Sequence, residues 1–334
     1  MSLDLAFVWA GLIALAVLMY VVMDGFDLGI GILFPFLKRA DDRDVMMNSI
    51  APVWDGNETW LVLGGGGLLA VFPLAYSLLM TAFYAPLIVM LLALVFRGVA
   101  FEFRFRDPRH RFFWDHGFAA GSIAATFCQG MVLGTFIQGI DVAGRSYAGG
   151  WFGWLTPFSV FTGFALLVGY ALLGATWLVM KTEGELQARV IRHAKWLALG
   201  TIAAIVAVSI WTPLLNLSYA MRWFAMPNMA YLAPVPLLVA ATAWALWRSL
   251  SRGQDVQPFV CALALFVLSF AGLAISLYPY LVPPQITIYE AAGPPESLAF
   301  LLAGAAVLLP IILAYTAYSY WVFRGKVRVG EGYH

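Results

Sequence analysis

The chain has 334 residues, of which 62% are hydrophobic and 11% charged, and its formal net charge at pH 7 is +1. Soluble domains carry roughly 25% charged residues. A soluble fold is therefore excluded, because a chain of this size could not bury so much apolar surface. The near-neutral charge also gives no basic surface for nucleic acid. These values predict an all-α protein that crosses a membrane several times.

About nine segments are long and apolar enough to span a bilayer, which takes ~20 residues each. The predicted spans lie near 6–36, 51–72, 76–97, 117–137, 157–180, 196–217, 230–249, 258–280 and 298–323. Pro234 and Pro236 interrupt the start of the seventh. The first apolar run has no basic region before it and is too long for the core of a cleavable signal peptide, so we expect a span there. The connections are too short to fold alone, which predicts a single integral membrane domain over residues 1–334.

The orientation follows from the basic residues, which accumulate in cytoplasmic connections. Of the 19 Lys and Arg, 17 fall in alternate connections, after spans 1, 3, 5, 7 and 9. These are Lys38, Arg39 and Arg43; Arg97, Arg104, Arg106, Arg109 and Arg111; Lys181, Arg189, Arg192 and Lys195; Arg248 and Arg252; and Arg324, Lys326 and Arg328. The other connections hold only Arg145 and Arg222. The pattern predicts an N-terminus outside and a C-terminus in the cytoplasm.

The most informative residues are carboxylates inside apolar spans. Asp24 and Asp27 lie in the first span, and Asp55 and Glu58 open the second. Each pair is spaced i, i+3 and so shares a helix face. Such groups are costly in lipid, so they usually face the interior of a bundle and mark proton or ion pathways. A short cytoplasmic loop joins the two spans and predicts antiparallel neighbours.

The rise of ~1.5 Å per residue places Asp55 and Glu58 roughly 5–12 Å, and Asp27 and Asp24 roughly 15–20 Å, from the cytoplasmic boundary. Arg97, at the cytoplasmic end of the third span, lies at a depth suited to the two shallow acids. This graded series predicts a proton path that enters from the cytoplasm. A purely structural network, with Arg97 as a fixed counter-ion, stays open as the alternative. The aromatic residues near span ends, among them Tyr318, Tyr320 and Trp321, fit an interfacial belt.

The sequence offers little that could carry electrons. Haem iron in proteins is held by His, Met, Cys or Tyr, and the four histidines, His110, His116, His193 and His334, all lie in or beside predicted cytoplasmic connections. Cys128 and Cys261 fall inside apolar runs, where a free thiol packs as a small hydrophobe. No zinc spacing, Walker motif or dinucleotide loop is present. The residues therefore predict no metal site and no catalytic group in this chain.

Several motifs resemble subunit II of the cytochrome bd-type quinol oxidases, including the cyanide-insensitive branch. The resemblance covers the whole chain, and its most specific part is the pair of motifs in the first two spans. The matching stretches are Asp24–Gly31, Asn48–Glu58, Phe96–Glu102, Pro310–Thr316 and Tyr320-Trp321.

The resemblance implies a function. It predicts a haem-free subunit of a complex in the bacterial inner membrane that oxidises a quinol and reduces O₂ to water. The haems b and d, and the main quinol-oxidising loop, would belong to a partner subunit I that this chain stabilises. It further implies two four-helix groups plus a peripheral ninth helix, and it allows small single-span subunits and a structural quinone or lipid.

Carried onto this sequence, the resemblance assigns the proton path to Asp24, Asp27 and Asp55. Glu58 ranks below Asp55, because some members of the family carry glutamine there. Arg97, and with it Asn57 and Trp54, would support these acids. A stand-alone proton-coupled transporter is the alternative reading, since it would share the buried acids, and a haem-carrying cytochrome is disfavoured by the positions of the histidines.

Overall fold

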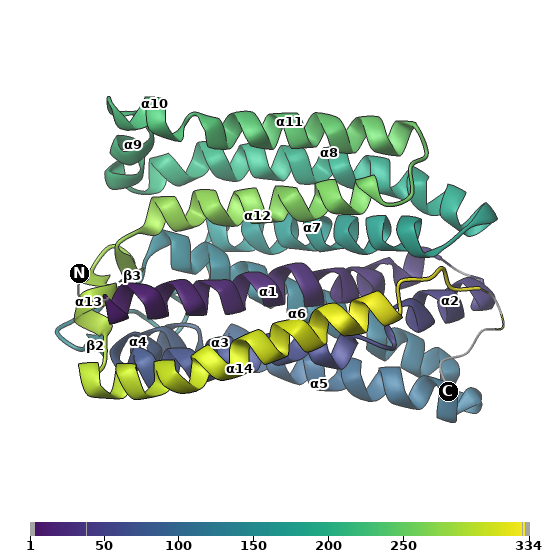
Figure 1. Cartoon of the computed structure of the whole chain (residues 1–334), viewed down its shortest axis with the longest axis horizontal. Coiled ribbons are helices and arrows are strands. Elements are labelled where there is room, and N and C mark those ends of the chain that lie inside the picture. Colours follow the sequence, from purple (N-terminus) through teal and green to yellow (C-terminus); the bar gives the residue numbers. More distant parts are fainter. Residues whose placement is uncertain (1–3, 38, 329, 331–334) are drawn as a thin grey trace.

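The structure is a computed structural model that describes residues 4–37, 39–328 and 330. Lys38, which belongs to the first predicted basic cluster, and His334 lie outside the described residues. The long helices are α1 (Leu5–Leu33), α3 (Trp54–Val71), α5 (Tyr84–Arg106), α6 (Arg111–Gln138), α7 (Pro157–Lys181), α8 (Gly184–Leu215), α11 (Pro234–Ser251), α12 (Gln257–Leu277) and α14 (Pro295–Val322). They run side by side along the long axis of the molecule (Figure 1).

Short elements connect the long helices. The helical ones are η1 (Phe34–Phe36), α2 (Ala40–Ile50), α4 (Pro73–Ala82), η2 (Pro108–His110), α9 (Leu217–Phe224), α10 (Asn228–Leu232) and α13 (Ile288–Ala291). Two antiparallel ribbons complete the chain, β1 (Val142–Ala143) with β2 (Ser146–Tyr147) and β3 (Tyr280–Val282) with β4 (Ile286–Thr287). The protein is therefore an all-α polytopic membrane protein.

Within the described ranges, eight helices are long and apolar enough to cross a membrane. The second predicted span, which forms α3, is not among them. Its first two turns hold Asp55, Asn57 and Glu58, and Gly64–Gly67 follow, so its mean hydropathy is low although it has 18 residues. α3 nevertheless packs along α1, as the sequence predicted for the first two spans.

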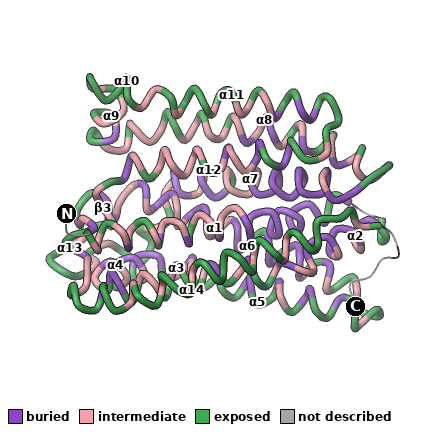
Figure 2. Tube along the Cα trace, in the orientation of Figure 1, coloured by how far each residue is buried: buried purple, intermediate pink, exposed green. Residues whose placement is uncertain are grey.

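The helices fall into two groups. In one, α1 packs on α3 and α6, and α6 packs on α5; in the other, α7, α8, α11 and α12 contact one another. The two groups meet where α7 packs on α1 and α6. The last helix, α14, touches α1 and α3 only lightly and has Leu298 as its one buried residue. Figure 2 shows the burial concentrated in α1, α6 and α7, whereas α14 alternates between exposed and intermediate residues.

Two local predictions need correction. The third span begins at Tyr84 rather than near residue 76, because Pro86 cannot continue a helix from the preceding turn and the chain breaks between α4 and α5. The connection between the first two spans is not a simple short loop, because it contains the 11-residue helix α2. The predicted interruption at the start of the seventh span is confirmed, since the helix breaks at Ala233 and Pro234 starts α11.

The described basic clusters gather at one end of the bundle, as the orientation argument requires. α2, the α5–α6 and α7–α8 turns and the C-terminal residues lie together there, opposite the N-terminus and both ribbons (Figure 1). Ion pairs bridge segments distant in sequence at this end, among them Arg39 to Glu185 at 3.0 Å and Arg43 to Asp115 at 2.8 Å. The side of the membrane on which each end lies stays a prediction.

Glycines let α1 and α7 approach closely. A Cβ atom on Gly29 would lie 1.9 Å from the carbonyl oxygen of Tyr170, and one on Gly174 would lie 2.4 Å from the carbonyl carbon of Gly29. Small residues commonly allow such contacts between membrane helices. The glycine face of α1 therefore packs against α7. Asp24 contacts Arg97 on α5, and Asp27 contacts Asn57 on α3.

Candidate functional site

The site centres on a buried arginine between two carboxylates. Arg97 Nη1 lies 2.9 Å from Asp24 Oδ1 and 3.5 Å from Glu58 Oε2. The side chains of Arg97 and Asp24 are 1% and 0% exposed, whereas that of Glu58 is 26% exposed. An ion pair at this depth is held only when the surrounding structure fixes both partners, because desolvation of the two charges is costly. Helices α1, α3 and α5 thus each contribute one charged group.

A second, neutral contact serves the other buried acid of α1. Asn57 Nδ2 donates to Asp27 Oδ2 at 2.7 Å, and the hydroxyl of Tyr320 on α14 donates to Asn57 Oδ1 at 2.8 Å. Asp27 and Asn57 are 0% and 1% exposed. No ion pair reaches Asp27 among the described residues, so its carboxyl relies on an amide donor.

The acids that contact Arg97 differ from the predicted ones. The sequence placed Arg97 beside the shallow acids Asp55 and Glu58, but Arg97 instead joins Glu58 to the deep Asp24. Asp55 is exposed and makes no ion pair with Arg97 within the part of the chain that the structure describes. The i, i+3 spacing leaves the two acids of α3 about 60° apart around the axis, and of the two only Glu58 reaches Arg97 on α5. The predicted ranking of Asp55 above Glu58 therefore has no support in the geometry.

Trp54 flanks the arginine. The guanidinium carbon of Arg97 lies 6.0 Å from the centroid of the Trp54 ring, which also packs on Phe101. The aromatic ring thus packs beside the guanidinium group.

Sequence reasoning missed two tyrosines near Asp24 and misread a third. Tyr20 and Tyr170 are buried, and the hydroxyl of Tyr20 interacts with Asp24 and that of Tyr170 with Gln129. Tyr20 precedes Asp24 by one helical turn, a spacing that could have revealed it. Tyr320 was assigned to an interfacial belt, yet its hydroxyl reaches the site. Nothing in the local sequence marks a contact between residues 57 and 320.

A separate ion network holds α2 against the α5–α6 turn. The buried Arg104 contacts Asp44 at 2.7 Å and Asp115 at 2.5 Å. Arg43 also pairs with Asp115, and Arg111 with Asp44. These bonds fix the helix that leads into α3, and so help to place the first turn of α3 beside α1.

The sequence model of the family described as cytochrome bd terminal oxidase subunit II matches residues 5–323. The chain belongs to this family. It is subunit II of a bd-type quinol oxidase, a quinol:O₂ oxidoreductase complex, which implies a partner subunit I and haems in the complex. Among the described residues, no group of three or more His, Cys, Asp or Glu side chains is placed to hold a metal ion.

Similar proteins extend over nearly the whole chain. Cytochrome bd-I ubiquinol oxidase subunit 2 of Escherichia coli strain K12 is 32% identical over 97% of this chain and 95% of its own length. Cytochrome bd ubiquinol oxidase subunit 2 of Bacillus subtilis is 27% identical over 96% of each. A chain of the bd oxidase structure from Geobacillus thermodenitrificans has a similar fold, with a TM-score of 0.74 at 18% identity, over 96% of this chain and 99% of that one.

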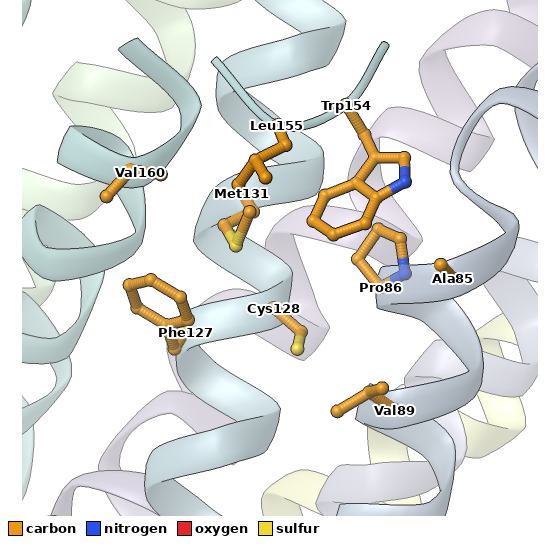
Figure 3. Close-up of a pocket in the computed structure, with 9 residues that line it drawn as sticks. All are labelled: Ala85, Pro86, Val89, Phe127, Cys128, Met131, Trp154, Leu155 and Val160. Carbon is orange, nitrogen blue, oxygen red and sulfur yellow. The ribbon is translucent and has the colours of Figure 1, made fainter. Parts of the chain in front are cut away.

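This subunit II also has an apolar pocket toward the end that carries the ribbons. Its volume is about 360 Å³. Figure 3 shows the lining side chains, which come from α5, from α6, from the segment before α7 and from α7 itself. They are Ala85, Pro86, Val89, Phe127, Cys128, Met131, Trp154, Leu155 and Val160. The lining holds no charged residue, which suits a hydrocarbon group.

Proposed function

We propose that this subunit takes up protons from the cytoplasm and passes them toward a haem-bearing subunit I for the reduction of O₂ to water. The observation that carries the proposal is the cluster of the buried Asp24 and Asp27 and the partly exposed Glu58 near Arg97, which is the one cation that contacts these acids among the described residues. Intramembrane carboxylates facing a bundle interior are typical of proton relays. One arginine can balance only one of three carboxylates, so the others must exchange protons or stay neutral.

The proposed route starts at the exposed Asp55 on the first turn of α3. One turn deeper, the half-exposed Glu58 takes the proton and gives it up beside Arg97. Asp24 accepts it, because Arg97 contacts both carboxylates, and Asp27 shares it through the same face of α1. Arg97 keeps the vacated carboxylates stable between transfers, while Asn57 and Trp54 hold Asp27 and Arg97 in place.

The proposal includes the setting of the subunit. The chain lies in the bacterial inner membrane with its N-terminus outside, and the end that carries the basic clusters faces the cytoplasm. Glu58 and Asp55 start the helix that leaves this end, which suits cytoplasmic uptake. The chain itself binds no haem, and its role toward subunit I is to stabilise it and to supply protons.

The apolar pocket is a suitable place for the structural quinone or lipid that this proposal allows. Its lining accepts the isoprenoid or acyl chain but offers no partner for a charged head group. Extraction of lipids and quinones from the purified complex, with and without Val89→Trp to fill the pocket, would test this. Loss of one bound species from the variant is expected, and unchanged contents would count against it.

The proposal that this chain binds no haem is tested by purification. The chain isolated alone should lack haem absorbance, and haem spectra should appear only when subunit I co-purifies. Haem absorbance in the chain isolated alone would contradict the proposal.

The proton path is tested by Asp24→Asn, which keeps the shape of the side chain and removes its exchangeable charge. We expect the complex to assemble with normal haem spectra and to consume O₂ at least ~10-fold more slowly, which corresponds to ~1.4 kcal/mol of barrier. Haem content and O₂ consumption are measured on the same preparation. Full turnover with normal assembly would leave the acids as a structural network.

A further inference from the structure

Tyr320 helps to hold the Asn57 amide against Asp27. The Tyr320 hydroxyl donates to Asn57 Oδ1 at 2.8 Å, and the amide nitrogen donates to Asp27 Oδ2 at 2.7 Å. The same nitrogen lies 3.5 Å from the Met23 carbonyl oxygen. A carboxylate only accepts hydrogen bonds, so Asp27 itself requires the donor end of the amide. The contact from α14 gives the oxygen end of the amide a partner and thereby fixes the Asn57 side chain beside Asp27.

The Tyr320 ring is held among aromatic side chains of the core. It meets Phe26 and Trp177 edge-on, with centroid distances of 6.4 and 6.2 Å. Phe26 and Trp177 in turn stack at 4.3 Å. Edge-on pairs of this kind are favourable beyond their buried area, so the ring has a defined place next to α1 and α7.

The chain beyond α14, residues 323–328, forms what we call the C-terminal strap. Val327 N donates to Lys181 O at 2.8 Å, and Lys326 Nζ contacts Thr182 O at 2.9 Å and Asp255 Oδ2 at 2.6 Å. Lys181 Nζ donates to the carbonyls of residues 323 and 325, and Arg328 pairs with Glu183. The strap thus ties the end of α14 to the α7–α8 and α11–α12 turns, as seen at the end of the yellow helix in Figure 1.

The strap matters because α14 has few other attachments. Its single buried residue is Leu298, near its start, where the Trp9 indole nitrogen donates to the Leu298 carbonyl at 3.0 Å. The opposite end of α14 is fixed by Tyr320 and by the strap. Between these ends α14 packs only lightly on α1 and α3, so loss of the strap should loosen the end of the helix that carries Tyr320.

We propose that Tyr320 is a positioning residue for Asp27 and that the C-terminal strap is the latch that keeps it in place. This rests on the proposed function, since it assumes that Asp27 carries protons. Proton transfer through Asp27 would then depend on the contacts of the strap at the cytoplasmic end of the bundle. One of these contacts joins Lys326 to Asp255, which lies about 70 residues earlier in the chain.

The first test is Tyr320→Phe in the intact oxidase complex, with Tyr318→Phe as the matched control. Tyr318 lies on the same helix, is 61% exposed and stacks on Trp321. Loss of one hydrogen bond should slow O₂ consumption about three- to tenfold and alter the dependence of turnover on pH, with haem content unchanged. Tyr318→Phe should change neither. An unchanged rate and pH profile in Tyr320→Phe would overturn the proposal.

A double-variant cycle separates this inference from the proposed function. In an Asp27→Asn background, Tyr320→Phe should cost nothing further, because the group that it positions no longer exchanges protons. An equal loss in both backgrounds would show that Tyr320 acts elsewhere and would overturn the inference. Full turnover in Asp27→Asn alone would instead remove Asp27 from the proton path, and so contradict the proposed function.

The latch is tested at the Lys326–Asp255 pair. Lys326→Asp should reproduce the altered pH profile of Tyr320→Phe. The charge swap Lys326→Asp with Asp255→Lys should restore part of the normal profile, because it re-forms the ion pair but not the bond to the Thr182 carbonyl. Arg324→Asp is the control, because within the described part of the chain Arg324 contacts only the Trp321 carbonyl and ring. If Lys326→Asp leaves the profile unchanged, or if the swap restores none of it, the strap is not the latch.

Discussion

Arg97 on α5 and Asp24 on α1 form an ion pair of 2.9 Å in which neither side chain is more than 1% exposed. The sequence separates them by more than 70 residues, and a different helix carries each. Removal of one partner from a buried pair costs more than the pair contributes, because an uncompensated charge stays behind.

Arg97→Met should impair the complex more than Asp24→Asn does, because Arg97 keeps Glu58 as a partner in Asp24→Asn, whereas Asp24 and Glu58 both lose their cation in Arg97→Met. We expect a loss of about 3–5 kcal/mol in stability, seen as poor recovery of haem-containing complex and a lower thermal transition. Arg97→Met combined with Asp24→Asn should recover much of the assembly. The exposed Arg106, changed to Met, is the control. Equal stability of Arg97→Met and the wild type would show that the ion pair does not contribute to the stability of the complex.

The two acids of α3 should differ in their contribution to turnover. Glu58→Gln removes the carboxyl that faces Arg97, and we expect O₂ consumption to fall at least ~10-fold. Asp55→Asn, at an exposed position, should cost less, because water can deliver protons to Glu58 directly. Both variants should retain haem. A larger loss for Asp55→Asn would restore the order that the sequence suggested.

The close crossing of α1 and α7 predicts a strong effect of a single methyl group. Gly29→Ala would place a Cβ 1.9 Å from a backbone oxygen that cannot move alone. Overpacking typically costs about 1–3 kcal/mol, so the yield and thermal stability of the complex should fall clearly. Gly11→Ala, on the same helix with nothing within 4 Å, is the control and should be neutral or slightly stabilising.

Cysteine labelling should settle which end of the bundle faces the cytoplasm. Arg106 and Ser146 are both exposed and lie at opposite ends of the bundle. Arg106→Cys should react with a membrane-impermeant reagent only from the cytoplasmic side, and Ser146→Cys only from outside. The native Cys128 and Cys261 are each 8% exposed and should stay unlabelled. Labelling of position 106 from outside would invert the proposed direction of proton uptake.

The Lys326–Asp255 contact of the strap should respond to pH only in acid. The hydrogen bond from Lys326 lowers the pKa of Asp255 below its ordinary value, which is ~3.9 in unfolded chains. A carboxyl with a lowered pKa contributes stability above that range and loses it as the pH falls through the folded pKa. Hydrogen exchange at residues 326–328, corrected for intrinsic rates, should therefore stay nearly constant from pH 7 to pH 5. Asp255→Asn should raise it throughout this range.

The sequence by itself determined the environment and the general layout of this protein. Long apolar runs require a bilayer, because no other medium can cover so much apolar surface. The alternation of basic and non-basic connections predicts on which side of the membrane each end of a span lies. Acids in such runs must face the interior, so Asp24 and Asp27 could be chosen without a structure. The Asp24–Gly31 and Asn48–Glu58 motifs carried the assignment to the bd oxidases.

Only the tertiary structure decided which groups meet. Depth counted along separate spans assumes straight helices of known start, but α2 and the break at Tyr84 shift α3 and α5 relative to α1. Those shifts bring Arg97 to Asp24 and leave Asp55 exposed. Likewise, the contact of Tyr320 with Asn57 depends on where the strap anchors α14, and 263 residues separate the two. Contacts of this kind follow from helix packing in three dimensions, which local sequence patterns do not contain.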